Sequence, residues 1–221
     1  MNLNDTLREV SKGPCGCSED EYRWMYQTCI EDLPGGPGVL VEIGSWYGAS
    51  TVVLGSAAQE LNTWLVSIDT FHLGFFPHED QYNYDAGRDK CDLVRDNARR
   101  ILNAGIRSHV HTHIADSVEH AKVCPIPDIK FLWIDGYHRY PQALTEWRAY
   151  APQVMPGGIV GIHDAQEPGG AKNCIEELEQ DGDFEGWTEI KLPDLKMPLQ
   201  LNEFDLDHKK QWLIRAWRKD G

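Results

Sequence analysis

The fold is decided by residues 39–51, which read Val39-Leu40-Val41-Glu42-Ile43-Gly44-Ser45-Trp46-Tyr47-Gly48-Ala49-Ser50-Thr51. The apolar run up to Ile43 predicts a buried strand, and the glycines after it predict a turn into a helix over residues 49–60. Ligands in open parallel sheets bind beyond the carboxyl ends of the strands, so this turn faces the expected pocket. We expect Gly44 to let the backbone pass close under a ligand and Gly48 to let the helix pack against the strand.

Apolar runs alternate with helical patterns along the rest of the chain, which predicts an α/β, Rossmann-like fold around a mostly parallel sheet. Further strands are expected at 64–68, 110–114, 129–134 and 158–162, and two C-terminal strands, which form an antiparallel edge, at 187–192 and 211–217. Helices are expected at 90–104 and from about Pro141 onward. Residues 1–37 form a helical preface, and residues 70–89 look like a lid. With no repeat or linker, the chain from 1 to 221 is expected to be one domain.

The composition excludes several classes of protein. The formal net charge is −14, with 21 basic and 35 acidic residues, and phosphate contacts need clustered Lys and Arg. No stretch approaches the roughly 20 apolar residues of a membrane span, and the N-terminus lacks the apolar core of a signal peptide. We therefore expect a cytoplasmic protein with neither a nucleic-acid nor a membrane partner. The six cysteines, which lack zinc-site spacing, are then expected to be free structural thiols.

The turn after the first strand favours a positively charged ligand over a dinucleotide. A dinucleotide fingerprint needs a second glycine where Trp46 stands, and Glu42 puts negative charge at the strand end. That charge suits S-adenosylmethionine, which carries an ammonium and a sulfonium group. Asp69 ends the next strand, roughly 20 residues after the turn, at the spacing of a ribose-binding carboxylate. Asp116, after the third strand, is a candidate for the adenine amino group, although a helix N-cap is equally natural for it.

Two further strands end in acids that predict a metal site. Asp135 follows the strand at 129–134, and Asp164 follows the strand at 158–162. If these strands are neighbours, the two carboxylates converge and repel unless a cation lies between them. Mg²⁺ with oxygen ligands resolves that conflict and would lower the pKa of a bound substrate hydroxyl. The open alternative is that both acids cap the turns that follow them.

Two histidines accompany these acids. His138, three residues after Asp135, is the candidate general base that accepts the proton of the substrate hydroxyl. His163 is a weaker candidate for a third metal ligand, because neighbouring residues of a regular strand point to opposite faces of the sheet.

Taken together, these residues resemble class I S-adenosylmethionine-dependent methyltransferases. The pattern D-G-x-H-x-Y, then P-G-G and H-D, is similar to a group that includes macrolide-sugar O-methyltransferases and cephalosporin-hydroxylase-like proteins; here it spans Asp135–Tyr140, Pro156–Gly158 and His163-Asp164. The resemblance implies a seven-stranded sheet with S-adenosylmethionine over the first two strands, metal ligands at Asp135 and Asp164, and His138 as the base. Relatives often carry Asp where Glu146 stands and Trp where Tyr150 stands.

The cofactor contacts are expected at Glu42, Gly44, Ser45, Trp46, Gly48, Ser50, Asp69, Thr70, Asp116, Ser117 and Asp135. The predicted function is S-adenosylmethionine-dependent, Mg²⁺-assisted O-methylation of a small hydroxylated acceptor such as a sugar, polyol or phenol. Three alternatives remain: an NAD-dependent oxidoreductase, a non-catalytic cofactor-binding or oligomerisation module, and a metal-dependent hydrolase using Asp135, His138 and Asp164. The aromatic loop at 70–89 fits either an acceptor or another subunit, so a homo-oligomer is left open.

Overall fold

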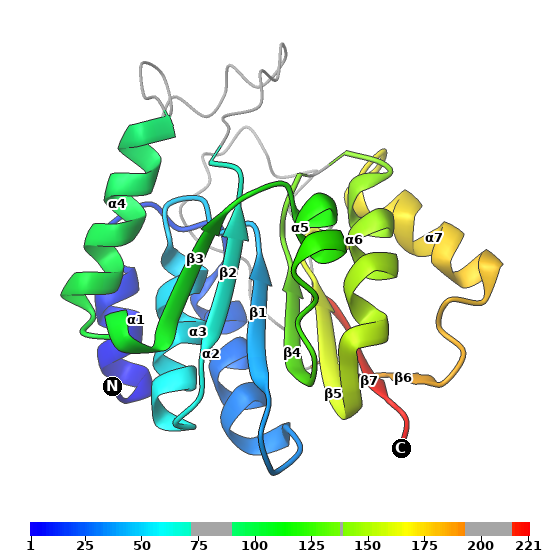
Figure 1. Cartoon of the computed structure of the whole chain (residues 1–221), viewed down its shortest axis with the longest axis horizontal. Helices are drawn as coiled ribbons and strands as arrows, with labels where there is room; N and C mark the ends of the chain where they lie inside the picture. The colour runs from blue at the N-terminus through cyan, green and yellow to red at the C-terminus, as the bar shows by residue number, and fades with distance from the viewer. Residues whose placement is uncertain (72–89, 138, 193–213) are drawn as a thin grey trace.

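The computed structural model describes residues 1–71, 90–137, 139–192 and 214–221. Its centre is a seven-stranded sheet with the order β3-β2-β1-β4-β5-β7-β6 (Figure 1). The strands are β1 (Val39–Ile43), β2 (Leu65–Asp69), β3 (Val110–Ile114), β4 (Ile129–Ile134), β5 (Val154–Ile162), β6 (Trp187–Glu189) and β7 (Arg215–Lys219). The first five strands are parallel, and β7 pairs antiparallel with β5 and β6. The predicted Rossmann-like sheet and its antiparallel edge are confirmed.

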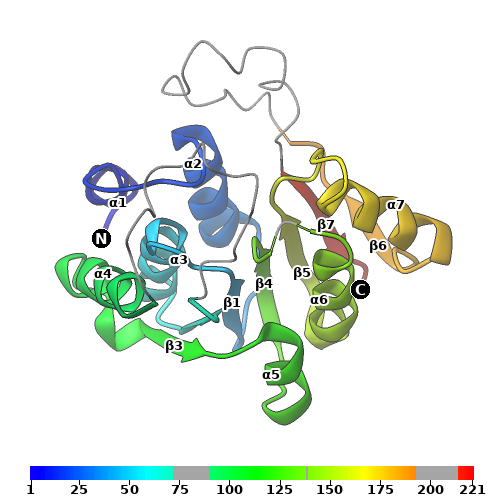
Figure 2. The ribbon, with the colours of Figure 1, turned by 90° about the horizontal axis from the view of Figure 1, so that it is seen from above.

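Helices cover both faces of this sheet (Figure 2). On one face lie α1 (Leu3–Val10), α2 (Glu19–Gln27), α3 (Ala49–Glu60) and α4 (Lys90–Asn103). On the other lie α5 (Ser117–Val123), α6 (Gln142–Tyr150) and α7 (Ala171–Asp181). Short helical turns occur at η1 (Thr28–Asp32), η2 (Arg107–His109) and η3 (Ala151–Gln153). The preface, residues 1–37, contains α1, α2 and η1, and all three pack against α3.

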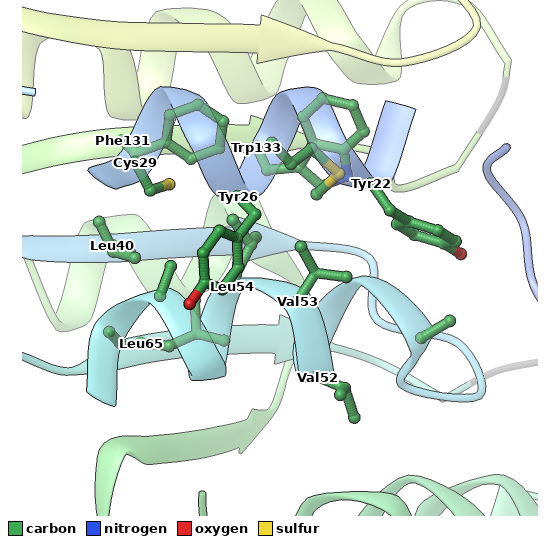
Figure 3. Close-up of a cluster of buried hydrophobic side chains, with 14 of the residues drawn as sticks. Tyr22, Tyr26, Cys29, Leu40, Val52, Val53, Leu54, Leu65, Phe131 and Trp133 are labelled. Carbon is green, nitrogen blue, oxygen red and sulfur yellow. The ribbon is translucent and has the colours of Figure 1, made fainter. Parts of the chain in front are cut away.

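The sheet is buried on both sides, which explains why its central strands are continuous apolar runs. Leu40, Phe131 and Trp133 face the α1–α4 side, whereas the intervening Val41 and Leu132 face the α5–α7 side. Figure 3 shows part of the hydrophobic core on the α1–α4 side of the sheet, in which Phe131 and Trp133 lie beneath α2. Their rings are stacked with centroids 6.5 Å apart. Trp24 of α2 packs against both rings, with centroid distances of 6.1 and 6.3 Å, and this contact fixes α2 over β4.

The start of α2 is set by its own sequence. Ser18 and Glu21 form a capping box, in which the Ser18 hydroxyl accepts from the Glu21 N–H at 3.2 Å and Glu21 Oε2 accepts from the Ser18 N–H at 2.6 Å. The packing over β4 brings this end of α2 close to the residue that follows β5, since Glu21 lies 3.4 Å from His163. The preface thus contributes to the carboxyl edge of the sheet.

The segment Pro156-Gly157-Gly158 differs from its expected place before a strand. It lies inside β5, which begins at Val154, and the pairing with β4 shifts register between Ile129 and Phe131. Proline lacks the N–H of a regular ladder, and Gly157 has φ +78°, so the strand accommodates these residues as an irregularity. The four extra residues at the start of β5 were missed because proline and paired glycines normally mark turns.

Within the described parts of the chain, we found no helix with the length and apolarity that crossing a bilayer requires. Residues 72–89 of the lid expected at 70–89 lie outside the described residues, as does His138.

Candidate active site

Gly44 is required where β1 meets β4. Its φ is +85°, and a Cβ atom placed on it would lie 1.9 Å from the backbone oxygen of Asp135. The same junction carries a 2.9 Å hydrogen bond from the Asp135 N–H to the Ile43 carbonyl. Gly44 was expected to give room to a ligand, but the close approach in the structure is to the protein's own backbone. The glycine thereby fixes the carboxylate-bearing end of β4 beside the turn.

Gly48 begins helix α3 in the left-handed conformation, with φ +83°. A Cβ at this position would lie 2.8 Å from Nδ2 of Asn97 on α4. Gly48 was expected to let the helix pack against the strand, but the close approach in the structure is to α4.

Asp69 ties the ends of β1 and β2 together. Its Oδ2 accepts from the backbone N–H groups of Ser45 at 2.7 Å and Trp46 at 2.8 Å, and its Oδ1 accepts from the N–H of Phe71 at 2.6 Å. These bonds hold Trp46 at φ +43°, a conformation that bulky residues rarely adopt. Each carboxylate oxygen accepts about two hydrogen bonds, so Oδ1 keeps capacity for a ribose hydroxyl whereas Oδ2 is filled.

Glu42 lies fully buried beneath this turn. Its Oε2 accepts from Thr51 and Ser67, each at 2.7 Å, whereas its Oε1 is buried with no hydrogen-bond partner among the described residues. Burial raises the pKa of Glu42 to about 7, against the opposing hydrogen bonds of Ser50, Ser67 and Thr51. Glu42 pairs in register with Ser67, two residues before Asp69, so both acids face the same side of the sheet. The orphaned oxygen fits a donor or cation near the turn.

The two residues at the start of α5, Asp116 and Ser117, make contacts within the protein. Asp116 is exposed and accepts from the Glu119 N–H at 2.9 Å, which is the N-cap alternative for this residue. Ser117 is buried and donates to Glu146 at 2.7 Å, and its carbonyl accepts from the Tyr150 hydroxyl at 2.7 Å. Glu146 and Tyr150, the two departures from the resemblance, therefore join α6 to the start of α5. Thr70 is exposed at the end of β2.

The predicted metal ligands meet where β4 and β5 end side by side. Asp135 Oδ1 lies 3.1 Å from Nδ1 of His163, and the same nitrogen lies 3.3 Å from Oδ1 of Asp164. The three side chains place donor atoms within 4.8 Å of one another. Burial alone lowers the pKa of His163, but its acidic neighbours Cys17, Asp135 and Asp164 outweigh burial and raise it well above its usual value.

The alternation argument against His163 is wrong for this strand. β5 ends at Ile162, and Asp164 adopts φ +52°, so the chain turns immediately and both side chains reach Asp135. The predicted convergence of Asp135 and Asp164 depends on β4 and β5 being neighbours, which they are.

A family model described as a methyltransferase domain matches residues 41–165, more than half of the chain. The chain belongs to this methyltransferase family. The match begins in β1 and ends one residue after Asp164, so it contains the turn, the strand ends and both carboxylates described above.

Solved methyltransferases share the fold at low identity. The O-methyltransferase TomG of Streptomyces achromogenes, solved in complex with SAM, has a TM-score of 0.65 and 12% identity, over 99% of this chain and 89% of that one. A putative caffeoyl-CoA O-methyltransferase of Staphylococcus aureus has a TM-score of 0.62 and 12% identity, over 100% and 93%. A putative rRNA methylase of Clostridium thermocellum has a TM-score of 0.61 and 11% identity, over 95% and 99%.

Two functional candidates were missed by the sequence analysis of this methyltransferase. Cys17 and Glu21, from the preface, lie beside His163, and the three donor atoms fall within 4.8 Å of one another. Burial raises the pKa of Cys17 to about 12, with His163 opposing that shift. All six cysteines are free, as expected. The Ser18-x-x-Glu21 spacing signals a helix start, but nothing local relates it to residue 163.

Proposed function

We propose that this methyltransferase uses S-adenosylmethionine to methylate a hydroxyl group of a small acceptor, with a divalent metal ion holding that hydroxyl. The observation that carries the proposal is the meeting of Asp135, His163 and Asp164 at the strand ends next to the β1 turn. This arrangement is supported by the family membership and by the position of both acids within the matched region.

The donor end of the site would be formed by the turn after β1 and the end of β2. Glu42 supplies a buried carboxylate with one unpartnered oxygen, and Oδ1 of Asp69 retains capacity for a ribose hydroxyl. Gly44 keeps the turn close to the end of β4, and Gly48 lets α4 pack close to the start of α3. S-adenosylmethionine supplies the electrophilic methyl group when bound, and the negative side chains attract its cationic groups. TomG, which shares the fold, was solved with SAM.

The acceptor end would be formed by Asp135 and Asp164. Their carboxylates are the hard oxygen ligands that Mg²⁺ prefers, and Mg²⁺ usually keeps several waters beside one or two carboxylates. His163 borders both acids through Nδ1. With Nδ1 unprotonated it completes the ligand set, and with Nδ1 protonated it donates to Asp135. A bound ion would lower the pKa of the acceptor hydroxyl.

His138 is proposed as the general base, on its spacing from Asp135 alone. It would take the hydroxyl proton as the oxygen attacks the methyl carbon. Most of the rate acceleration would come from holding the two reactants in line.

A small acceptor fits the chain better than a nucleic acid does. The fold is shared by proteins described as O-methyltransferases and by a putative rRNA methylase. The formal net charge of −14 disfavours the second kind of acceptor, because RNA binding needs a positive surface.

The test is a methyl-transfer assay with labelled S-adenosylmethionine and a panel of sugars, polyols and phenols, with Mg²⁺ or with EDTA. Calorimetric titration with S-adenosylhomocysteine and with NADH runs beside it. We expect binding of the first ligand only, and transfer that stops with EDTA. Tight NADH binding without S-adenosylhomocysteine binding would favour an oxidoreductase. Cofactor binding without transfer to any acceptor would favour a non-catalytic module. Transfer that persists in EDTA would show that the reaction needs no metal ion.

A further inference from the structure

A second cluster of possible metal-binding atoms shares His163 with the cluster of Asp135 and Asp164. It consists of Cys17, Glu21 and His163, which are 5%, 4% and 7% exposed. The thiol, one carboxylate oxygen and one imidazole nitrogen lie within 4.8 Å of one another. Cys17 and Glu21 come from the preface and His163 follows β5, so the cluster joins two distant parts of the chain.

One polar atom of this cluster lacks a hydrogen bond among the described residues. Glu21 Oε2 is used in the capping box with Ser18, whereas Glu21 Oε1 is buried without a hydrogen bond and faces His163 Nε2 at 3.4 Å. A buried carboxylate with an unpartnered oxygen is destabilising unless a proton or a cation neutralises it. The oxygen without a hydrogen bond therefore faces the imidazole of His163, close to the thiol of Cys17.

We propose that Cys17, Glu21 and His163 form a transition-metal site for Zn²⁺. Sulfur, imidazole nitrogen and carboxylate oxygen are the ligand types of zinc, and thiolate selects zinc over magnesium. A tetrahedral ion with bonds of about 2.0–2.3 Å fits among these atoms after small side-chain rotations, with water in the fourth position. On binding, a Zn–S bond replaces the S–H bond of Cys17, and the thiol proton leaves to solvent.

In this proposal the two imidazole nitrogens of His163 bind different partners. Nε2 binds zinc beside Glu21, and Nδ1 keeps its proton and donates to Asp135, 3.1 Å away. Such a carboxylate–histidine–metal arrangement fixes the tautomer and the orientation of the ring. The hydroxyl-holding ion is then left to Asp135, Asp164 and water. The zinc ion anchors the N-terminal end of α2 to the end of β5, beside the reaction centre.

Metal binding to the purified full chain tests the site without any activity assay. Stripped protein is dialysed against Zn²⁺ with Mg²⁺ in excess, and bound metal is counted by mass spectrometry. Co²⁺ is then substituted, because thiolate coordination produces a near-ultraviolet charge-transfer band. We expect one zinc ion per chain and a thiolate–cobalt band. A chain that takes up no zinc, or shows no such band, overturns the proposal.

Three variants assign the ligands. Cys17→Ser should abolish the charge-transfer band and weaken zinc binding by about 100-fold or more. Glu21→Gln should weaken binding while its amide oxygen still accepts the Ser18 N–H of the capping box. Cys15→Ser is the matched control, since Cys15 is exposed and outside the cluster. Unchanged zinc affinity in Cys17→Ser, or an equal loss in Cys15→Ser, contradicts the assignment.

The zinc site is distinguishable from the proposed methyl transfer. Asp164→Asn removes a carboxylate of the acceptor end but no zinc ligand, so it should keep the cobalt band. If the transfer assay fails while the cobalt band is intact, the proposed methyl transfer is contradicted and the zinc site is not. Circular dichroism of each variant separates ligand loss from unfolding.

Discussion

Oδ2 of Asp69 accepts the backbone N–H of Trp46 at 2.8 Å, and this bond joins the end of β2 to the turn that follows β1. The same oxygen also accepts the Ser45 N–H. One carboxylate thereby links the ends of β1 and β2, which form the proposed donor end of the site.

Asp69→Asn should weaken both the fold and the binding of S-adenosylhomocysteine. An amide has a single acceptor oxygen, so at least one buried N–H of the turn loses its partner, at about 1–3 kcal/mol. Urea denaturation measures the first effect and calorimetric titration the second. Asp128→Asn is the matched control, because Asp128 is exposed and precedes β4 at the opposite edge. Equal behaviour of the two variants would contradict the role of Asp69.

Gly44→Ala should destabilise the protein by on the order of 3 kcal/mol. The new Cβ would lie 1.9 Å from the Asp135 carbonyl oxygen, in a backbone conformation with φ +85° that alanine resists. Thermal unfolding measures the effect. In Gly35→Ala, the control, the added methyl group meets nothing within 4 Å, so its melting temperature should stay close to the wild-type value. A stable Gly44→Ala protein would mean that the β1–β4 junction is looser than described.

Asp164→Asn should reduce methyl transfer by about 100-fold or more and leave the affinity for S-adenosylhomocysteine nearly intact. The substitution removes a charged ligand of the proposed ion, whose polarisation of the hydroxyl contributes several kcal/mol. Asparagine tolerates the φ of +52° at this position, whereas Asp164→Ala adds backbone strain. Steady-state rates and titration measure the two effects. A comparable loss of affinity for S-adenosylhomocysteine and of the rate of methyl transfer would mean that Asp164 acts in cofactor binding instead.

Glu42 should make the ligand-free protein less stable as the pH rises from about 4.5 to about 7. The folded state holds the proton of Glu42 up to about pH 7, whereas the unfolded chain releases it near 4.5. The unfolded state therefore binds fewer protons in this window, and the free energy of unfolding falls with pH. The buried carboxyl accounts for about 3 kcal/mol of that fall.

Urea denaturation of wild type and Glu42→Gln at pH 5 and pH 7.5 checks this prediction. The decline should be smaller in Glu42→Gln, because an amide does not ionise, and unchanged in the exposed control Glu185→Gln. A parallel decline in wild type and Glu42→Gln would show that Glu42 is ionised throughout.

Much of the fold was predictable because its signals are local. Strands β3 and β4 and helix α3 have the bounds expected from sequence. The error at β5 has a local cause as well: proline and paired glycines resemble a turn, and only the pairing of the flanking Val154 and Ile159 with β4 keeps them inside a strand.

The position of the candidate site was predictable where an acidic residue stands directly at the end of a strand in the sequence. Asp69, Asp135 and Asp164 follow apolar runs, and parallel strands bring their carboxyl ends to one edge. What the carboxylates contact was not predictable, because hydrogen bonds depend on side-chain direction. Asp69 binds backbone N–H groups of the neighbouring turn, and Ser117 faces Glu146 on α6.

The sequence by itself determined the order of strands and helices, the glycine turn and the acids at the strand ends, because each depends on neighbours within a few residues. Only the tertiary structure decided that His163 lies between Asp135 on one side and Glu21 with Cys17 on the other. Helix α2 reaches that position by packing Trp24 against Phe131 and Trp133 of β4. A contact between residues so far apart in the chain leaves no spacing that a local pattern can record.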